Sequence, residues 1–231
     1  MMDNLVGTVG PLPAISLRMQ NPNAPSRRHR VALAAVAGGG VALLAAFIAR
    51  LGIDEQWQID HHIRSVLSEH EIPRTRAALR AVSTAGTVGG YAPATLLAII
   101  IIASRRDARA RLLPLAGSVA GAVTTSLALK HVVRRPRPRT KAGPVNEKPS
   151  FPSGHATRAT ATALAIAYVL VRERMVPRSI ALPIAVATAL ATGVSRAYAD
   201  AHWTTDVIGG WALGGASAAA SALWYERLRA R

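Results

Sequence analysis

The sequence has no cysteine, few aromatic residues and far fewer acidic than basic residues. Without cysteine the chain has no disulfide scaffold, no thiolate nucleophile and no cysteine metal site. Aromatic residues make up 4% of its 231 residues, which is few for a protein that stacks on nucleic-acid bases. Charged residues reach 17% while hydrophobic residues reach 50%, and this composition excludes a disordered or collagen-like chain.

The shortage of acidic residues leaves a formal net charge of +16, from 28 Lys and Arg against 12 Asp and Glu. A charge of this size points to nucleic acid or to an anionic membrane as the partner. The basic residues stand at the ends of uncharged segments and do not form one continuous basic stretch. We therefore expect the lipid bilayer as the partner and no nucleic acid.

Long uncharged segments dominate the rest of the sequence. The first covers residues 31–49, and at about 1.5 Å per residue a helix of this length crosses a hydrocarbon core of about 30 Å. Because the segment is longer than the apolar part of a usual signal peptide, we expect a retained anchor and not a cleaved signal. Five further segments follow, at residues 81–103, 112–129, 155–171, 180–194 and 206–224.

These six segments predict an all-α fold, a bundle of six transmembrane helices. Their many Gly, Ala, Ser and Thr residues are typical of closely packed membrane helices. A soluble, Ala-rich helical bundle is the alternative, and the Arg residues at the segment ends favour the membrane. Residues 53–79 are not a span: apolar residues at helical spacing predict an amphipathic helix at the extracytoplasmic membrane surface, which Pro73 should interrupt.

The segments divide the chain into a mobile leader over residues 1–30, a six-span domain over 31–225 and a basic tail over 226–231. An even number of spans places both termini on one side of the membrane. Lys and Arg are almost equally numerous on the two sides. Once the basic residues of the polar clusters described next are discounted, the excess predicts cytoplasmic termini in the inner (plasma) membrane, with the clusters on the extracytoplasmic face.

Polar residues gather in three clusters, each at the end of a span on the non-terminal side. The first cluster pairs a lysine with an Arg-Pro, the second is a Pro-Ser-Gly-His sequence, and the third combines Ser-Arg with a histidine and an aspartate. In order, they comprise Lys130, Arg137 and Pro138; Pro152, Ser153, Gly154 and His155; and Ser195, Arg196, His202 and Asp206. Folding can therefore bring the three clusters together at one membrane face.

The residue types in these clusters favour chemistry on a phosphate. Lys130, Arg137 and Arg196 supply fixed positive charge, and Arg binds phosphate oxygens with two parallel hydrogen bonds. The backbone N–H groups of Ser153 and Gly154 stand where a helix should begin, and a helix N-terminus binds anions.

Two histidines supply the reactive groups. His202 and Asp206 are four residues apart, on one face of a helix, so the carboxylate can orient the imidazole as a nucleophile. His155 can then protonate a leaving oxygen. The combination predicts phosphoryl transfer by covalent catalysis. Metal binding by both histidines and Asp206 is the alternative, and the neighbouring cations disfavour it because they would repel a divalent ion.

The three clusters together resemble the signature of the type-2 phosphatidic-acid phosphatase superfamily: K-x6-RP, then PSGH, then SR-x5-H-x3-D. Every signature position is present in this sequence. The resemblance extends over roughly residues 31–225 and implies a helical, metal-independent membrane lipid phosphatase that needs no cofactor. It also implies that His202 forms a phosphohistidine, that Asp206 orients it and that His155 protonates the leaving group. The phosphate would be held by Lys130, Arg137, Ser153, Gly154 and Arg196.

Two arginines outside the signature are candidate headgroup contacts. Arg158 lies one turn after His155 in a segment that is otherwise apolar or hydroxylated, and a charge in such a segment is costly unless it is paired or used. It would form a salt bridge, or it would contact a second phosphate or a headgroup. Arg135, between Lys130 and Arg137, would attract anionic headgroups or belong to a solvated loop.

The sequence thus predicts hydrolysis of a lipid phosphate or diphosphate. Candidate substrates are a polyprenyl phosphate or diphosphate, phosphatidic acid and phosphatidylglycerol phosphate. Two other functions stay open: a phosphotransferase that uses the same phosphohistidine, and a protein that binds anionic lipid without turnover. A soluble vanadate-dependent haloperoxidase has similar anion-site motifs, and the six apolar segments disfavour it. A homo-oligomer is compatible with the sequence.

Overall fold

A computed structural model describes residues 26–50, 54–69, 88–104, 107–138 and 148–230. These residues form helices and connecting segments and contain no strand, so the all-α prediction is confirmed for the part of the chain that the structure describes. The helices are α1 (Arg27–Arg50), α2 (Asp54–Glu69), α4 (Val88–Ala103), α5 (Ala108–Val133), α6 (Gly154–Arg172), α7 (Arg178–Tyr198) and α8 (Thr204–Arg229).

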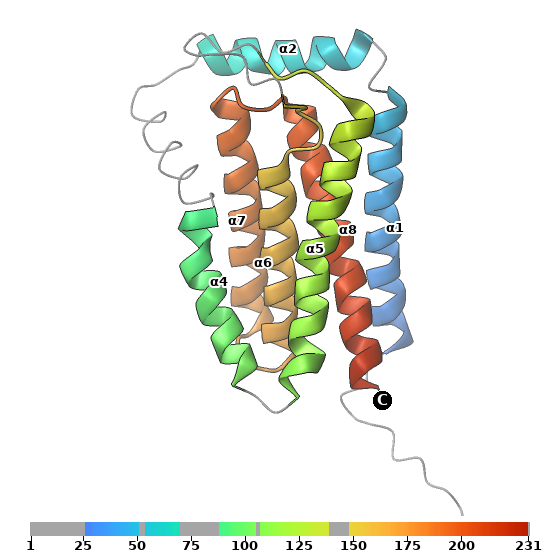
Figure 1. Ribbon diagram of the computed structural model, residues 1–231, viewed down its shortest axis with the longest axis vertical. Helices are drawn as coiled ribbons and strands as arrows, with labels where there is room; N and C mark the ends of the chain where they lie inside the picture. Colours follow the sequence, from blue (N-terminus) through green and yellow to red (C-terminus); the bar gives the residue numbers. More distant parts are fainter. Residues whose placement is uncertain (1–25, 51–53, 70–87, 105–106, 139–147, 231) are drawn as a thin grey trace, which may run out of the picture.

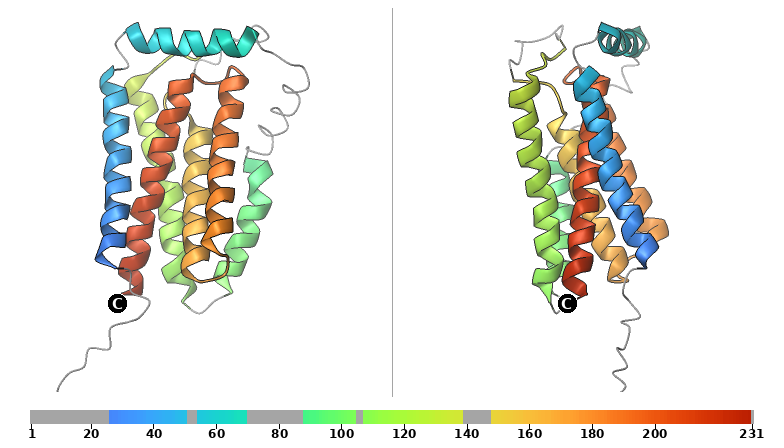
Figure 2. Two further views of the ribbon diagram at one scale, coloured as in Figure 1. Left: turned by 180° about the vertical axis from the view of Figure 1, so that it is seen from behind. Right: turned by 90° about the vertical axis from the view of Figure 1, so that its right-hand side faces the viewer.

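Six of these helices run side by side as an elongated bundle, and α2 lies across one end of it (Figure 1). Helix α8 packs against α1, α5, α6 and α7, and α6 packs against α4, α5, α7 and α8. The left view of Figure 2 shows α1 at one edge of the bundle and α4 at the other. The C-terminus lies at the end opposite α2 (Figure 1).

The distribution of side-chain sizes is that of a membrane protein. Large apolar side chains point outward, among them Ile100, Val132 and Ile184, with 55%, 75% and 61% of their surface exposed. The buried residues between the helices are mostly small, and many are alanines of α6, α7 and α8. Outward-facing large residues and a small-residue interior suit a lipid environment, in which close approach of backbones drives helix association.

Four of the described helices are long and apolar enough to cross a membrane: α1, α5, α7 and α8. Each extends beyond the uncharged segment predicted for it, because a helix continues through polar end residues while its backbone hydrogen bonds are made. Helix α1 therefore includes Arg27, Arg28 and Arg30, which the sequence analysis placed in the leader, and α8 continues through Arg229 into the predicted tail. The remainder of the predicted leader, residues 1–25, lies outside the described residues.

Helix α2 falls within the segment predicted to form a surface helix, and it ends at Glu69. Pro73 and the start of the second predicted span, residues 81–87, lie outside the described residues. Ile59 and Val66 of α2 are exposed, whereas Asp60 has 1% of its surface exposed. The residue that α2 buries most deeply among those described is thus a carboxylate, and its contacts are described with the site.

Candidate active site

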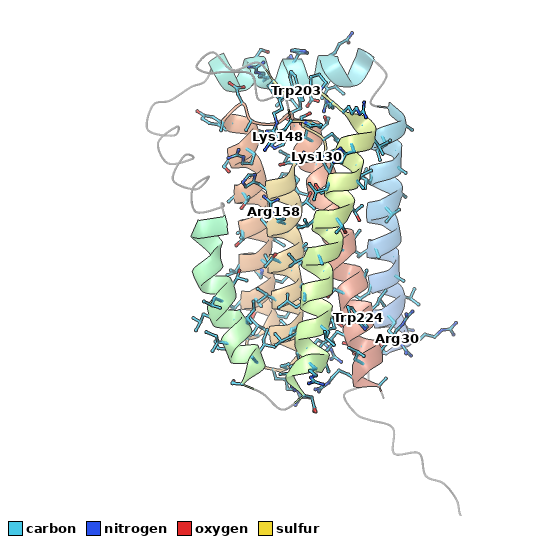
Figure 3. All side chains as sticks on the ribbon, viewed as in Figure 1. Arg30, Lys130, Lys148, Arg158, Trp203 and Trp224 are labelled. Atoms are coloured by element: carbon cyan, nitrogen blue, oxygen red, sulfur yellow. The ribbon has the colours of Figure 1, made fainter. Side chains whose placement is uncertain are left out.

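The three polar clusters meet at the end of the bundle that α2 covers. Lys130 lies in the last turn of α5, Gly154 begins α6, Arg196 lies in the last turn of α7 and Asp206 lies in the first turn of α8. Figure 3 shows Lys130, Arg158 and Trp203 in the same half of the bundle, while Arg30 and Trp224 lie at the opposite end. Residues up to 76 positions apart in the sequence therefore share one site because successive helices run in alternating directions.

His202 and Asp206 form the buried centre of the site, with 3% and 0% of their surface exposed. The His202 Nδ1 atom lies 3.5 Å from Asp206 Oδ2, a charge contact longer than a good hydrogen bond. The backbone N–H of Trp203 donates to the same Oδ2 at 2.9 Å. On the other side of the ring, His202 Nε2 lies 3.4 Å from Arg137 Nη1. The nitrogen turned away from the carboxylate therefore faces the cationic groups.

Burial lowers the pKa of His202 from its ordinary value of 6.5, and the positive charges of Arg137 and Lys130 lower it further. Asp206 acts in the opposite direction. The net direction favours the neutral imidazole at neutral pH, because the charged form is penalised in a buried position. A neutral ring has a lone pair available for attack, so this electrostatic setting suits a nucleophile.

The cations of the first cluster are held by backbone carbonyls. Lys130 Nζ donates to the carbonyls of Pro149 and Ser150 at 2.8 and 3.3 Å. Arg137 donates through Nε to the Lys148 carbonyl at 2.9 Å and through Nη1 to the Ala201 carbonyl at 2.8 Å. Because these acceptors are neutral carbonyls, these contacts do not offset the positive charge that either side chain offers to an anionic ligand. Arg196 lies within electrostatic range of Arg137 and of His155.

The second cluster forms the start of α6. The Ser153 side chain is fully buried, and its Oγ atom has no hydrogen-bond partner among the described residues. Its backbone N–H donates to the backbone carbonyl of Asp206 at 2.9 Å. This N–H is therefore not available to an anion, contrary to the prediction from the sequence. The N–H groups of the first helical turn, beginning with Gly154, have no acceptor within the helix. An anion seat here would therefore use the Ser153 hydroxyl and that first turn.

His155 and Arg158 extend the site along α6. His155 is partly exposed and lies within electrostatic range of Arg196, Arg158, His202 and Arg137. The Arg158 guanidinium folds back toward the start of the helix: its Nη1 atom lies 3.4 Å from the position that a Cβ of Gly154 would occupy. Arg158 is thus placed beside the second cluster, where a further anionic group could reach it.

Glycines of α8 hold the second and third clusters together. A Cβ at Gly210 would lie 2.8 Å from the Ser153 carbonyl, and a Cβ at Gly209 would lie 2.6 Å from the buried ring of Phe151. The absence of these side chains lets α8 approach the start of α6. This close approach brings α6, which carries His155, next to α8, which begins just after His202.

Arg135 lies in a different setting from the headgroup contact or solvated loop that the sequence analysis expected. It is buried, with 4% of its surface exposed, and its guanidinium pairs with Asp206 Oδ1 at 2.8 Å and with Asp60 Oδ2 at 2.6 Å. Its position behind the His202–Asp206 pair explains the difference, since a buried guanidinium is stable only beside compensating carboxylates.

Sequence reasoning missed Asp60, Thr205 and Trp203. Asp60 follows Trp57 by three residues and precedes Ile63 by three, so it stands on the apolar side of its helix. A carboxylate on the apolar side of a helix is rarely buried unless it is paired, so the sequence contained a signal that Asp60 has a partner inside the protein. The Trp203 indole donates to the Pro136 carbonyl at 2.9 Å and lies under the Arg135 guanidinium, a contact that spacing alone does not reveal.

No group of three or more His, Asp or Glu side chains within the described residues is arranged to hold a metal ion. Besides Asp206, the groups that act on His202 are the cations Arg137 and Lys130. Such groups stabilise the oxygens of a phosphate directly.

Comparison with known proteins gives consistent results. Residues 111–230 match the sequence profile of the PAP2 superfamily. The chain is 36% identical over 91 residues to phosphatidylglycerophosphatase B of Bacillus subtilis (strain 168), a match that covers 37% of this chain and 44% of that protein. The chain therefore aligns with less than half of the length of this curated relative.

Two solved structures have similar folds. The crystal structure of a transmembrane PAP2-type phosphatidylglycerolphosphate phosphatase from Bacillus subtilis superposes with a TM-score of 0.63 at 22% identity, covering 87% of this chain and 94% of that chain. The crystal structure of Aquifex aeolicus LpxE superposes with a TM-score of 0.51 at 25% identity, covering 69% of this chain and 92% of the other. The profile match includes all three polar clusters, from Lys130 to Asp206.

Proposed function

The chain belongs to the PAP2 superfamily, and from this premise we propose that it is an integral-membrane, metal-independent phosphatase that hydrolyses a lipid phosphate through a phosphohistidine. The observation that carries the proposal is the buried His202–Asp206 pair, whose outward nitrogen lies beside Arg137. A binding protein without turnover would need the cations but would have no use for a buried nucleophile and its orienting carboxylate.

In the first step His202 Nε2 attacks the phosphorus atom, and the bond from phosphorus to the lipid oxygen breaks. Asp206 stabilises the positive charge that develops on the ring and keeps the proton on Nδ1. Lys130, Arg137, Arg196 and the Ser153 hydroxyl hold the phosphate oxygens. His155, in its protonated form, gives its proton to the departing oxygen, which leaves on the lipid alcohol when the substrate is a monophosphate and on the lipid monophosphate when it is a diphosphate.

In the second step a water molecule attacks the phosphohistidine. His155, now neutral, accepts one proton of this water, and the N–P bond breaks to return His202 to its original state. The products are the dephosphorylated lipid and inorganic phosphate. The phosphoryl group stays beside Arg137 through both steps, so the cations stabilise both transition states.

The position of the site supports a membrane lipid as the substrate. An apolar cavity of about 260 Å³ lies between α4, α6 and α7 and begins at Ala159, the residue after Arg158. A lipid phosphate bound at His202 would have this cavity within reach of its hydrocarbon chain. We infer that α4 and α6 also cross the bilayer, giving six spans, and that the site opens on the extracytoplasmic face of the plasma membrane.

Candidate substrates are a polyprenyl phosphate or diphosphate, phosphatidic acid and phosphatidylglycerol phosphate. Both curated and structural relatives from Bacillus subtilis are described as phosphatases of phosphatidylglycerol phosphate, which places that lipid in the first test. Release of inorganic phosphate should be measured from each lipid in mixed micelles, with and without EDTA. Product analysis with an added acceptor lipid separates hydrolysis from phosphotransfer.

The decisive variant is His202→Ala, with His131→Ala as its matched control because His131 is exposed at the end of α5. We expect His202→Ala to lose turnover and the control to retain it, with EDTA changing neither. An acid-labile phosphoprotein should form in the wild type and be absent in His202→Ala. Full activity of His202→Ala would refute the proposed mechanism, and loss of wild-type activity in EDTA would refute metal independence.

A further inference from the structure

Behind the His202–Asp206 pair lies a second layer of buried charge that includes helix α2. Asp206 uses its Oδ1 atom to accept a hydrogen bond from Arg135 Nη1 at 2.8 Å, while its Oδ2 atom faces His202. Arg135 also pairs through Nη2 with Asp60 of α2 at 2.6 Å. All three side chains are at least 97% buried. A continuous chain of contacts therefore connects α2 to the proposed nucleophile.

We propose that Asp60 and Arg135 are positioning residues that fix the Asp206 carboxylate and preserve its negative field at His202. The inference rests on the proposed function, because it assigns these residues a role in the same reaction. Neither residue belongs to the three-part signature, and Asp60 lies on a helix outside the six-helix bundle (Figure 1).

The orientation argument comes from the number of donors on Asp206. A carboxylate can rotate about its terminal bond, and a nucleophile requires that one oxygen stay directed at Nδ1 of the ring. Arg135 occupies Oδ1, and the Trp203 N–H occupies part of Oδ2. Among the described residues, removal of the Arg135 contact leaves the Trp203 N–H as the one hydrogen-bond donor that resists rotation, so the contact between Asp206 and His202 would loosen.

The electrostatic argument explains why Asp60 is needed as well. Arg135 alone would cancel the negative charge of Asp206 and weaken its attraction for the positive ring that forms when His202 attacks phosphorus. Asp60 offsets Arg135, so that the group of Asp60, Arg135 and Asp206 keeps one net negative charge. At full burial this charge acts at close range with little screening.

Asp60 has a further anchor on α8, the helix that begins just after His202. Its Oδ1 accepts the backbone N–H of Thr205 at 3.0 Å, and its Oδ2 accepts the Thr205 hydroxyl at 2.5 Å. Thr205 lies in the first turn of α8, where N–H groups have no acceptor in their own helix. The Asp60 carboxylate of α2 thus caps the N-terminus of α8, where its negative charge interacts favourably with the helix dipole.

The test uses Asp60→Asn, which keeps an acceptor for the Thr205 N–H and removes both the charge that balances Arg135 and the oxygen that accepts its Nη2 hydrogen bond. We expect kcat for the lipid phosphate to fall by up to about a hundredfold, with KM changed little because the phosphate cradle is untouched. The matched control is Arg64→Ala. Arg64 of α2 forms a partly exposed ion pair with Asp200, 2.8 Å long, which also attaches α2 to the bundle. The Arg64→Ala variant loses this ion pair, and we expect it to keep wild-type kcat.

Arg135→Gln supplies a second measurement that does not depend on the folding of Asp60→Asn. The double variant Asp60→Asn/Arg135→Gln contains no unbalanced buried charge from this pair, and its kcat should equal that of Arg135→Gln alone because both residues act through Asp206. Independent, multiplying losses would overturn the inference, as would a kcat for folded Asp60→Asn equal to that of the wild type. A rise in KM equal to the loss in kcat/KM would assign Asp60 to substrate binding and also overturn it. Lack of turnover by the wild type on every lipid phosphate would instead contradict the proposed function.

Discussion

The packing of α8 against α6 allows a test of how tightly the fold controls the site. A Cβ built at Gly214 would lie 2.6 Å from the Thr157 carbonyl oxygen, 2.7 Å from Thr160 Cβ and 3.1 Å from the Ala161 nitrogen. Two of these three atoms belong to the backbone of α6, so rotation of a side chain cannot relieve the contact. Gly215, the next residue of the same helix, has no atom within 4 Å of the equivalent position.

Comparison of Gly214→Ala with Gly215→Ala therefore isolates the packing. Both substitutions improve helix propensity by about 1 kcal/mol, and only Gly214→Ala overpacks an interface, at a cost of about 1–3 kcal/mol. The free energy of unfolding should differ between the two variants by that cost. At about 2–4 °C per kcal/mol for a chain of this size, Gly214→Ala should melt roughly 2–12 °C below Gly215→Ala.

The same overpacking should reduce activity. Ordinary contacts lie at about 3.5–4.0 Å, so α6 and α8 must move apart by about 1 Å near Thr157, two residues after His155. A displacement of about 1 Å can lower turnover by about a hundredfold. Thermal unfolding in detergent and phosphate release from the lipid should be measured on both variants. Equal melting temperatures and equal kcat values would refute the reasoning that contact between these two helices holds His155 and His202 in register.

Three further predictions concern charge. Because burial lowers the pKa of His202, the acidic limb of kcat/KM, where the attacking nitrogen becomes protonated, should lie below pH 6.5. Asp206→Asn should move this acidic limb to still lower pH because Asp206 raises that pKa, and an unmoved limb would assign it to the substrate. Arg158→Ala should lower activity on a lipid diphosphate more than on a monophosphate, because its guanidinium lies beside Gly154; equal losses in the phosphate-release assay would exclude a second-phosphate contact. Arg111→Met should lower the melting temperature and leave kcat unchanged, because it removes the buried ion-pair partner of Glu173, 2.8 Å away. Breaking such a pair costs about 3–5 kcal/mol. An unchanged melting temperature would show that Tyr225 and Arg229, which also contact Glu173, are enough to stabilise its buried charge.

The sequence by itself determined the fold class and the family. Uncharged segments long enough to cross a bilayer predict helices, because a backbone in lipid must satisfy its hydrogen bonds within one segment. The three motifs that begin at Lys130, Pro152 and Ser195 then identified the superfamily by their resemblance to its signature. Local rules of this kind can be read from neighbouring residues without knowledge of the fold.

Only the tertiary structure decided how the site is supported. Asp60 and Arg135 are 75 positions apart, and no periodicity in the sequence relates a surface-helix carboxylate to an arginine inside the first motif. The sequence likewise predicts that the Ser153 N–H binds an anion, whereas in the structure this N–H donates a hydrogen bond to the Asp206 carbonyl. Burial is the physical reason in both cases: whether a polar group faces solvent, ligand or another buried charge depends on which helices pack together, and that packing is set by small residues such as Gly210 and Gly214 over the whole bundle.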